Sequence, residues 1–449
     1  MLSIFLCVAA VVICFVAARR SLVTGIGTTL VIGYVYGIVR ANVPQAGSHF
    51  IFDAAVVGLF AGRLSAAKRD EEQPIPRHLI WWVVALMAWP CFLMAIPKQD
   101  MLVQLVGLRG NAFLLPFILL GAQLTNAEKY KLALWCAVLN ILAFSVAAAE
   151  YQMGISAFFP HNVVTKLIYQ SNDVVGHSNY RIPSTFGNAH AYGGTMVMTL
   201  PLILGAWLQQ QKRTTAGVVI ALSILAASVG VFLSAARSHA LLLFAFIGFA
   251  TVAARMTLLA RAGWLALLAT VAILVASDVR LQRFMSLSDT SAVAERIGWS
   301  VNTSFIDLGI QYPLGNGLGG GGTSIPFFLS DRIEPHAGIE NEYGRIMMEQ
   351  GIPGLLLWVA FIFWVFLQRQ SESDRGWRNA RTLAFCVIGV GFGSAMMGTG
   401  LLTSVPQTAL FLLTVGWIAS CRRQTTQHPA VVVSRPDSQQ LVPAGQQWS

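Results

Sequence analysis

The chain has 449 residues, of which 55% are hydrophobic and only 11% are charged, and its mean hydropathy is +0.63. About a quarter of the residues in a soluble domain are charged, so this composition excludes an ordinary soluble enzyme. The net charge of +10 does not call for nucleic acid, because the basic residues cluster in short loops between apolar segments, as in cytoplasmic loops of membrane proteins.

Long apolar stretches recur from Met1 to Ala419, and each approaches the roughly 20 residues that a helix needs to cross a bilayer. Lipid cannot satisfy backbone polar groups, so we expect an all-α polytopic membrane protein with about 12–13 transmembrane helices. Arg19 and Arg20 follow the first stretch rather than precede it, which favours a retained first helix over a cleaved signal peptide. The expected spans are 3–18, 22–39, 50–66, 79–96, 101–123, 130–149, 190–208, 215–235, 238–255, 262–277, 347–367, 380–398 and 403–420.

These spans form one transmembrane domain, residues 1–423, and the basic loops assign its cytoplasmic side. The tail 424–449 is rich in Gln, Pro, Ser and Val, and we expect it to be a disordered cytoplasmic segment. The six cysteines are widely spaced without a CxxC pair, so neither a zinc site nor a disulfide framework is indicated.

Two long intervals, 151–189 and 278–341, fall on the opposite, extracytoplasmic side. Loops of such length inside a compact protein are usually functional. The second and larger loop contains an expected helix, 294–310, and the glycine run 315–322, which we interpret as a lid or a site-forming element.

Four arginines depart from the usual charge bias, because they lie on or next to the extracytoplasmic face: Arg181, Arg237, Arg296 and Arg332. Arginine near a membrane normally has a partner, and its planar fork suits phosphate oxygens. We therefore expect these side chains to gather around one cavity and bind a diphosphate. The alternative for each is a headgroup contact or a helix cap.

The segment 334–345 enters the span that ends near Leu367 and carries Glu340 and His336. A carboxylate or an imidazole at the mouth of a membrane helix suits general-base work on a sugar hydroxyl. The alternative is an acidic helix N-terminus that complements the helix dipole.

The sequence contains no motif typical of nucleotide-dependent or metal-dependent sugar transfer. No Lys-Ser/Thr follows the glycine run, which argues against a P-loop, and there is no DxD motif. We expect metal-independent chemistry without a cofactor. His161, His177 and His190 are interpreted as structural or substrate-contacting residues.

Four segments together resemble the integral-membrane O-antigen polymerase and O-antigen ligase superfamily. They are Arg181 to Asn188, the Ser-x-x-Arg turn at 234–237, Arg296 to Gly319, and Asn341 to Gly354 with its Asn-x-Tyr and Glu-x-Gly-x-x-Gly pattern. The likeness covers about Tyr151 to Leu367.

The resemblance implies a GT-C-like fold in a bacterial inner membrane, with the active site facing the periplasm. It implies metal-independent transfer of a glycan from undecaprenyl diphosphate to a glycan or lipid-linked acceptor. We expect this transfer to be a single displacement that inverts the anomeric configuration. Arg181, Arg237 and Arg296 match the family arginines that would hold the diphosphate. From the residues themselves we also expect Arg332, Asn341 and Tyr343 to contact substrate and Glu340 or His336 to be the base. A chain-length regulator is a candidate partner, alongside membrane lipids.

The family's ligases typically have a histidine immediately before Asn-x-Tyr, whereas this chain has Glu340. This difference favours a repeat-unit polymerase over a ligase that joins the glycan to a lipid A-core acceptor. A lipid-linked glycan transporter or flippase is the alternative from another class. It is less favoured because the chain shows no repeated halves of the kind found in many transporters.

Overall fold

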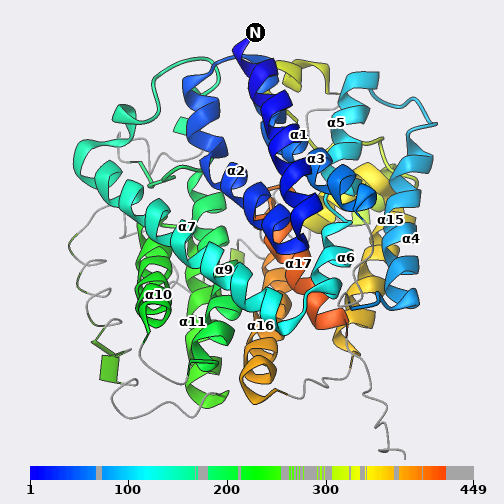
Figure 1. Cartoon of the computed structure of the whole chain (residues 1–449). Helices are drawn as coiled ribbons and strands as arrows, with labels where there is room; N and C mark the ends of the chain where they lie inside the picture. The colour runs from blue at the N-terminus through cyan, green and yellow to red at the C-terminus, as the bar shows by residue number, and fades with distance from the viewer. Residues whose placement is uncertain are drawn as a thin grey trace, which may run out of the picture.

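The computed structural model describes residues 1–66, 73–166, 168, 169, 180–210, 214–253, 306–322, 325–333, 339, 341–368, 374–396 and 398–420, with scattered residues between 262 and 298. Within this part of the chain the structure is helical (Figure 1). Its helices are α1 (Leu2–Arg20), α2 (Leu22–Asn42), α3 (Ile51–Ser65), α4 (Arg77–Leu93), α5 (Met101–Ala112), α6 (Phe117–Gln123), α7 (Asn126–Met153), α9 (Ala189–Leu208), α10 (Thr215–Leu233), α11 (Arg237–Ala253), α14 (Ile306–Gln311), α15 (Glu342–Phe366), α16 (Arg375–Ser394) and α17 (Gln407–Ala419), with 3-10 turns η1 (Ala46–Phe50), η2 (Ile155–Ala157) and η4 (Phe327–Arg332).

Among the described residues, seven helical segments are long and apolar enough to span a membrane: α1, α2, α5 with α6, α7, α9, α10 and α15. Three shorter apolar helices lie in α4, α11 and α17. This confirms a multi-pass helical membrane protein. The count of twelve or thirteen spans stays a prediction, since most of the expected span 262–277 lies outside the described residues, as does the tail 424–449.

Successive membrane-spanning segments alternate in direction, with α5 and α6 counted as one segment, so the bundle has two distinct ends. We call the site end the one where α2, α10 and α16 finish and where α9, α11, α15 and α17 begin; the N-terminus lies there, at the top of Figure 1. The opposite, basic end carries Arg19 and Arg20 at the end of α1, and Lys131 and Arg378 at the starts of α7 and α16.

Polar side chains join the helices inside the apolar core. Tyr34 of α2 donates to Asn140 Oδ1 of α7 at 2.7 Å, and Asn140 Nδ2 donates to Thr199 Oγ1 of α9 at 2.8 Å. Two glycines let α6 and α17 approach closely, because a Cβ at Gly121 or Gly416 would collide with the facing backbone. Small residues and interhelical hydrogen bonds are the usual means of packing helices in lipid. This packing holds the helix termini at the site end in fixed positions.

The glycine run 315–322 packs between α5 and α15. Asn316 N–H donates to Met348 O at 2.6 Å, and Lys98 Nζ donates to Gly315 O at 2.6 Å. Gly107 of α5 faces the backbone of Leu318 and Gly319 with no room for a Cβ. The glycines thus serve close packing here, and residues 315–322 do not line either of the two large described cavities.

Candidate functional site

The segment from Arg181 to Asn188 is wedged between three helices at the site end. Ser184, in a left-handed conformation at φ 53°, donates its N–H to Glu150 Oε2 of α7 at 2.8 Å. Its hydroxyl donates to Ala143 O at 2.6 Å, and Ile38 N–H of α2 donates to Thr185 O at 3.0 Å. These bonds hold the turn that precedes α9 and so orient Arg181.

Arg181 is buried, with 8% of its surface exposed, and its Nη1 lies 3.0 Å from His190 Nε2 in the first turn of α9. The His190 ring lies 5.7 Å from that of His239 in α11, and Gln407 Nε2 lies 3.4 Å from His239 Nε2. Residues far apart in the sequence thus meet at the site end. The meeting point is formed by the first turns of α9, α11 and α17.

A cavity of about 350 Å³ opens beside this meeting point, and we call it the histidine cavity. Arg237, half-buried, is the first residue of α11 and directly precedes Ser238 and His239 in its wall. The turn before it contains Ala235 at φ 47°, which brings α11 back antiparallel to α10. The described lining residues are His190, Ser238, His239, Leu242, Ile339, Ser394, Ala395, Gly398, Thr399, Gly400, Leu401, Ser404 and Gln407.

A second cavity, of about 340 Å³, adjoins the first, and we call it the arginine cavity. Its wall contains Arg40 from the end of α2, His49 from η1, Arg109 from α5 and His190 from α9. The two cavities share His190, Thr399, Gly400 and Ser404. No Asp or Glu is among the described residues that line either one.

The two arginines of this second cavity differ in their contacts. Arg109 Nε donates to Asp53 Oδ2 at 2.6 Å, so part of its charge is compensated from behind the wall. The Arg40 guanidinium lies 5.4 Å from the Tyr36 ring, and its Nε is buried without a hydrogen-bond partner among the described residues. Burial together with the positive charges of Arg40 and Arg109 lowers the pKa of His49 to about 3, which keeps this imidazole neutral.

The loop 398–406 forms the wall common to both cavities, and a carboxylate holds it. Gly400 N–H donates to Glu342 Oε2 at 2.8 Å, and Thr408 Oγ1 donates to Leu401 O at 3.0 Å. Glu342 belongs to the first turn of α15, where its own N–H donates to Ala395 O. The start of α15 therefore fixes the shape of the shared wall.

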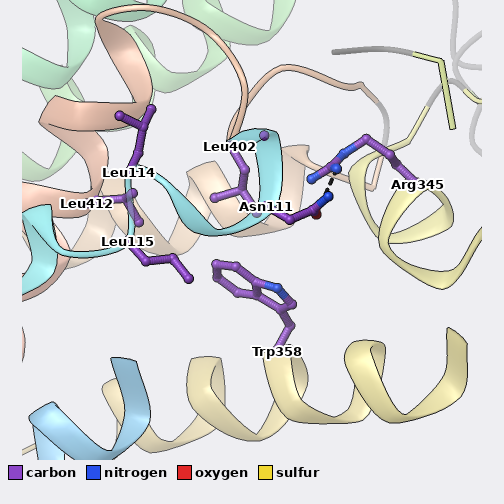
Figure 2. A pocket seen from close by; sticks show the side chains of 8 residues that line it. Asn111, Leu114, Leu115, Arg345, Trp358, Leu402 and Leu412 are labelled. Atoms are coloured by element: carbon purple, nitrogen blue, oxygen red, sulfur yellow. Dashed lines mark hydrogen bonds between the residues drawn. The ribbon is translucent and has the colours of Figure 1, made fainter. Parts of the chain in front are cut away.

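A buried polar network continues from Glu342 into the bundle. Arg345 forms ion pairs with Glu342 Oε1 at 2.7 Å and with Glu349 Oε2 at 2.8 Å, and its Nη1 donates to Asn111 Oδ1 at 2.9 Å. Asn111 Nδ2 donates to Glu349 at 2.6 Å, and Gln350 Nε2 donates to Asn111 at 2.8 Å. Figure 2 shows Arg345 and Asn111 meeting above Trp358. Every charge in this network has a partner within it, so its evident role is structural.

The sequence-predicted site residues separate into distinct environments. Arg181 and Arg237 lie at or next to the histidine cavity. Arg332 is half-exposed, lies 3.5 Å from Asp100, and lines neither cavity. Arg296, His336 and Glu340 lie outside the described residues.

Asn341 and Tyr343 have structural contacts. The Asn341 side chain is buried and accepts the Gly344 N–H as the N-cap of α15, while Tyr343 donates its hydroxyl to Phe392 O at 2.8 Å. Neither lines the histidine or the arginine cavity. Their substrate contact stays a prediction, and these bonds explain the Asn-x-Tyr spacing by helix capping and helix packing.

Sequence reasoning missed Arg40, Arg109 and His49 and left His190 undecided. A signal was available for Arg40, which lies in the last turn of α2 at the site end, against the charge bias that singled out Arg181. Arg109 lies in the last turn of α5 and carries no such signal. Nothing in the local sequence could bring His239 and Gln407 together. Among the described residues, no group of three or more His, Cys, Asp and Glu is placed to hold a metal ion.

Comparison with family models, with curated proteins and with solved structures finds no match for this chain.

Proposed function

We propose that the protein is a membrane glycosyltransferase that moves a glycan from undecaprenyl diphosphate to an acceptor sugar at the extracytoplasmic face. The observation that carries the proposal is the histidine cavity, with Arg181, His190 and Arg237 in or beside its wall and no described carboxylate lining it. A pocket with this charge favours an anion, and a lipid diphosphate is the anion that a membrane bundle can receive from the side.

The chemistry requires stabilisation of a leaving group. When an acceptor hydroxyl attacks the anomeric carbon, the bond from that carbon to the diphosphate oxygen breaks and its electron pair stays on the diphosphate. Guanidinium groups fixed before the reaction stabilise the charge as it develops. Arg181 meets this requirement because the hydrogen bonds around Ser184 hold its segment in place.

The attacking hydroxyl must also lose its proton, and Glu340 or His336 is the proposed base. Ile339 lines the histidine cavity and Asn341 caps α15, and Glu340 is the residue between them in the chain. Both candidates precede the same helix, so each remains in the proposal. Transfer by this route is a single displacement and inverts the anomeric configuration.

The distribution of charge supports the proposed extracytoplasmic location. Arg19, Arg20, Lys131 and Arg378 belong to the basic end, and short loops rich in Lys and Arg stay in the cytoplasm. The cavities belong to the other end of the bundle, which would face the periplasm of a bacterial inner membrane. A GT-C-like arrangement is part of this proposal.

Polymerase activity is preferred over ligase activity because Glu340 occupies the position at which the ligases that the chain resembles carry histidine. The test is purified protein in phosphatidylcholine vesicles with undecaprenyl-diphosphate-linked repeat units. A polymerase produces longer lipid-linked glycans and releases undecaprenyl diphosphate. A ligase consumes the donor only when lipid A-core is supplied, and a transporter moves the donor across the bilayer with no change in glycan length. Either of the last two results would contradict the polymerase.

The base is identified in the same assay with Glu340→Gln and His336→Ala. The variant that lacks the base loses activity by roughly 100-fold or more, in the range of general-base removal, while the other keeps it. If the two purified variants are both fully active, neither Glu340 nor His336 is the base.

A further inference from the structure

The arginine cavity is a second site that the transfer chemistry described above does not use. Arg181 contacts His190 in the wall common to both cavities, and Arg237 precedes the histidine-cavity residue Ser238. Arg40 and Arg109 line the arginine cavity alone. The protein thus has two sets of guanidinium groups at the site end, and only one is needed to stabilise a leaving diphosphate.

The second set is built to receive an anion. Arg40 Nε is buried without a hydrogen-bond partner among the described residues. A buried donor that makes no hydrogen bond costs free energy, because it has lost its bond to water. Arg40 Nη2 also approaches Gly187 so closely that it would lie 3.2 Å from a Cβ there, which directs the guanidinium toward the start of α9. The N-terminus of that helix, with Asn188 as its N-cap, adds a positive dipole end to the same wall.

Compensation of these charges by the protein is incomplete. Asp53 pairs with Arg109 at 2.6 Å from behind the wall, whereas the described lining contains no carboxylate that could pair with Arg40. Tyr36, Thr403 and Ser404 supply hydroxyl groups to the wall. A volume of about 340 Å³ is sufficient for a small ligand.

We infer that the arginine cavity binds the phosphate groups of a second lipid, the carrier of the acceptor glycan, next to the donor in the histidine cavity. This inference rests on the proposed function for the acceptor role, but the anion site itself does not. The two cavities share four lining residues, His190, Thr399, Gly400 and Ser404. Ligands in the two cavities would therefore be neighbours, as a transfer between two lipid-linked glycans requires.

Counting the bound ligands tests the anion site without requiring glycan transfer. Full-length protein in phosphatidylcholine nanodiscs is titrated with undecaprenyl diphosphate that carries no glycan, and bound copies are counted by native mass spectrometry. Wild type binds two copies, and Arg40→Gln and Arg181→Ala bind one each. Arg378→Gln, an exposed arginine at the basic end, binds two. Two copies on Arg40→Gln with unchanged affinity would overturn the inference.

A second variant protects the test against misfolding. Asp53→Asn combined with Arg109→Gln removes the pair as a neutral unit, so no buried charge loses its partner. We expect affinity at the second site to fall roughly tenfold or more, as for loss of a hydrogen bond to a charged group. An unchanged affinity in this folded double variant counts against the site.

The source of the phosphate is decided by competition. Phosphatidylglycerol added to the same nanodiscs should displace neither copy of undecaprenyl diphosphate. Displacement of the copy that depends on Arg40 would overturn the assignment to the acceptor's carrier, since the site would then bind an ordinary anionic headgroup.

Kinetics separate this inference from the proposed function. Arg40→Gln should raise KM for the lipid-linked acceptor roughly tenfold and leave kcat unchanged, because it removes binding and no transition-state contact. Two bound copies with no glycan transfer by wild type would defeat the proposed function and leave the anion site standing. Transfer with an unchanged acceptor KM in Arg40→Gln would defeat the acceptor role alone.

Discussion

Two groups of arginines in this bundle show opposite relations between charge and structure. Arg345 is fully buried, with an exposed fraction of 0%. It forms ion pairs with Glu342 and Glu349 and donates a hydrogen bond to Asn111. Arg40 lines a cavity whose described wall has no carboxylate, whereas its neighbour Arg109 is paired with Asp53 behind that wall. A compensated charge stabilises a fold, whereas an uncompensated charge beside a cavity favours a ligand. The residue type is the same, and only the partners distinguish the roles.

The largest effect is expected at the compensated network. Arg345→Met should destabilise the protein by about 3–5 kcal/mol, because removal of one partner leaves two carboxylates buried without their cation. The measurement is thermal unfolding in detergent, with Arg378→Met as the matched exposed control. An unfolding midpoint equal to that of the control would mean that the network does not stabilise the bundle.

The next effect tests the cavity side of the comparison. Arg181→Ala should lower glycan transfer by about 100-fold or more, the cost of removing a preorganised donor that stabilises developing charge. Its unfolding midpoint should shift much less than that of Arg345→Met. Product is measured as glycan chain length on gels, and full-length product from Arg181→Ala would falsify the role of this arginine.

The pH dependence of stability tests the charge around His49. Since the pKa of folded His49 is about 3 and its ordinary value is near 6.5, the unfolded chain takes up a proton first as the pH falls. Stability is therefore unaffected above pH 6.5 and decreases below it, by about 1.4 kcal/mol at pH 5.5 from this group. Unfolding midpoints at pH 7.5 and 5.5 measure the difference, and His49→Gln should reduce it by this amount. Equal pH dependence in the two proteins would contradict the lowered pKa.

The smallest effect is expected at Arg332, which is not among the described lining residues of either cavity. Its exposed pair with Asp100 is the kind worth about 0–1 kcal/mol, so Arg332→Ala should keep transfer within about twofold of wild type. The same chain-length assay applies. A tenfold loss of glycan transfer would show that Arg332 contacts substrate and that its pair with Asp100 is not maintained during the reaction.

The apolar pattern predicted most of the fold that the structure describes. Spans expected at 22–39, 190–208 and 215–235 correspond closely to α2, α9 and α10. The stretch expected as one span at 101–123 is divided by a turn near Pro116 into α5 and α6. Proline lacks a backbone N–H, so this division has a local cause that hydropathy does not register.

Part of the candidate site could be predicted, since Arg181 and Arg237 oppose the charge bias of their own loops. Arg109 lies inside the expected span 101–123 and Arg40 directly follows the span 22–39, so neither belongs to the two long loops in which site residues were sought. His239 could not be predicted for another reason. It belongs to the site through its neighbours: Gln407 Nε2 lies 3.4 Å from His239 Nε2, and the ring centroids of His190 and His239 are 5.7 Å apart. Contacts between three helices cannot be read from spacing within any one of them.

The amino-acid sequence by itself determined that this chain is a helical membrane protein and which of its ends is basic, because bilayer thickness and charge act on each segment separately. The tertiary structure alone decided which polar residues are compensated and which line a cavity. The same motif shows the difference, since Glu342 and Arg345 pair with each other while Gly400, more than fifty residues later, completes the carboxylate's hydrogen bonds. Compensation depends on distance in space, and distance in the chain does not determine it.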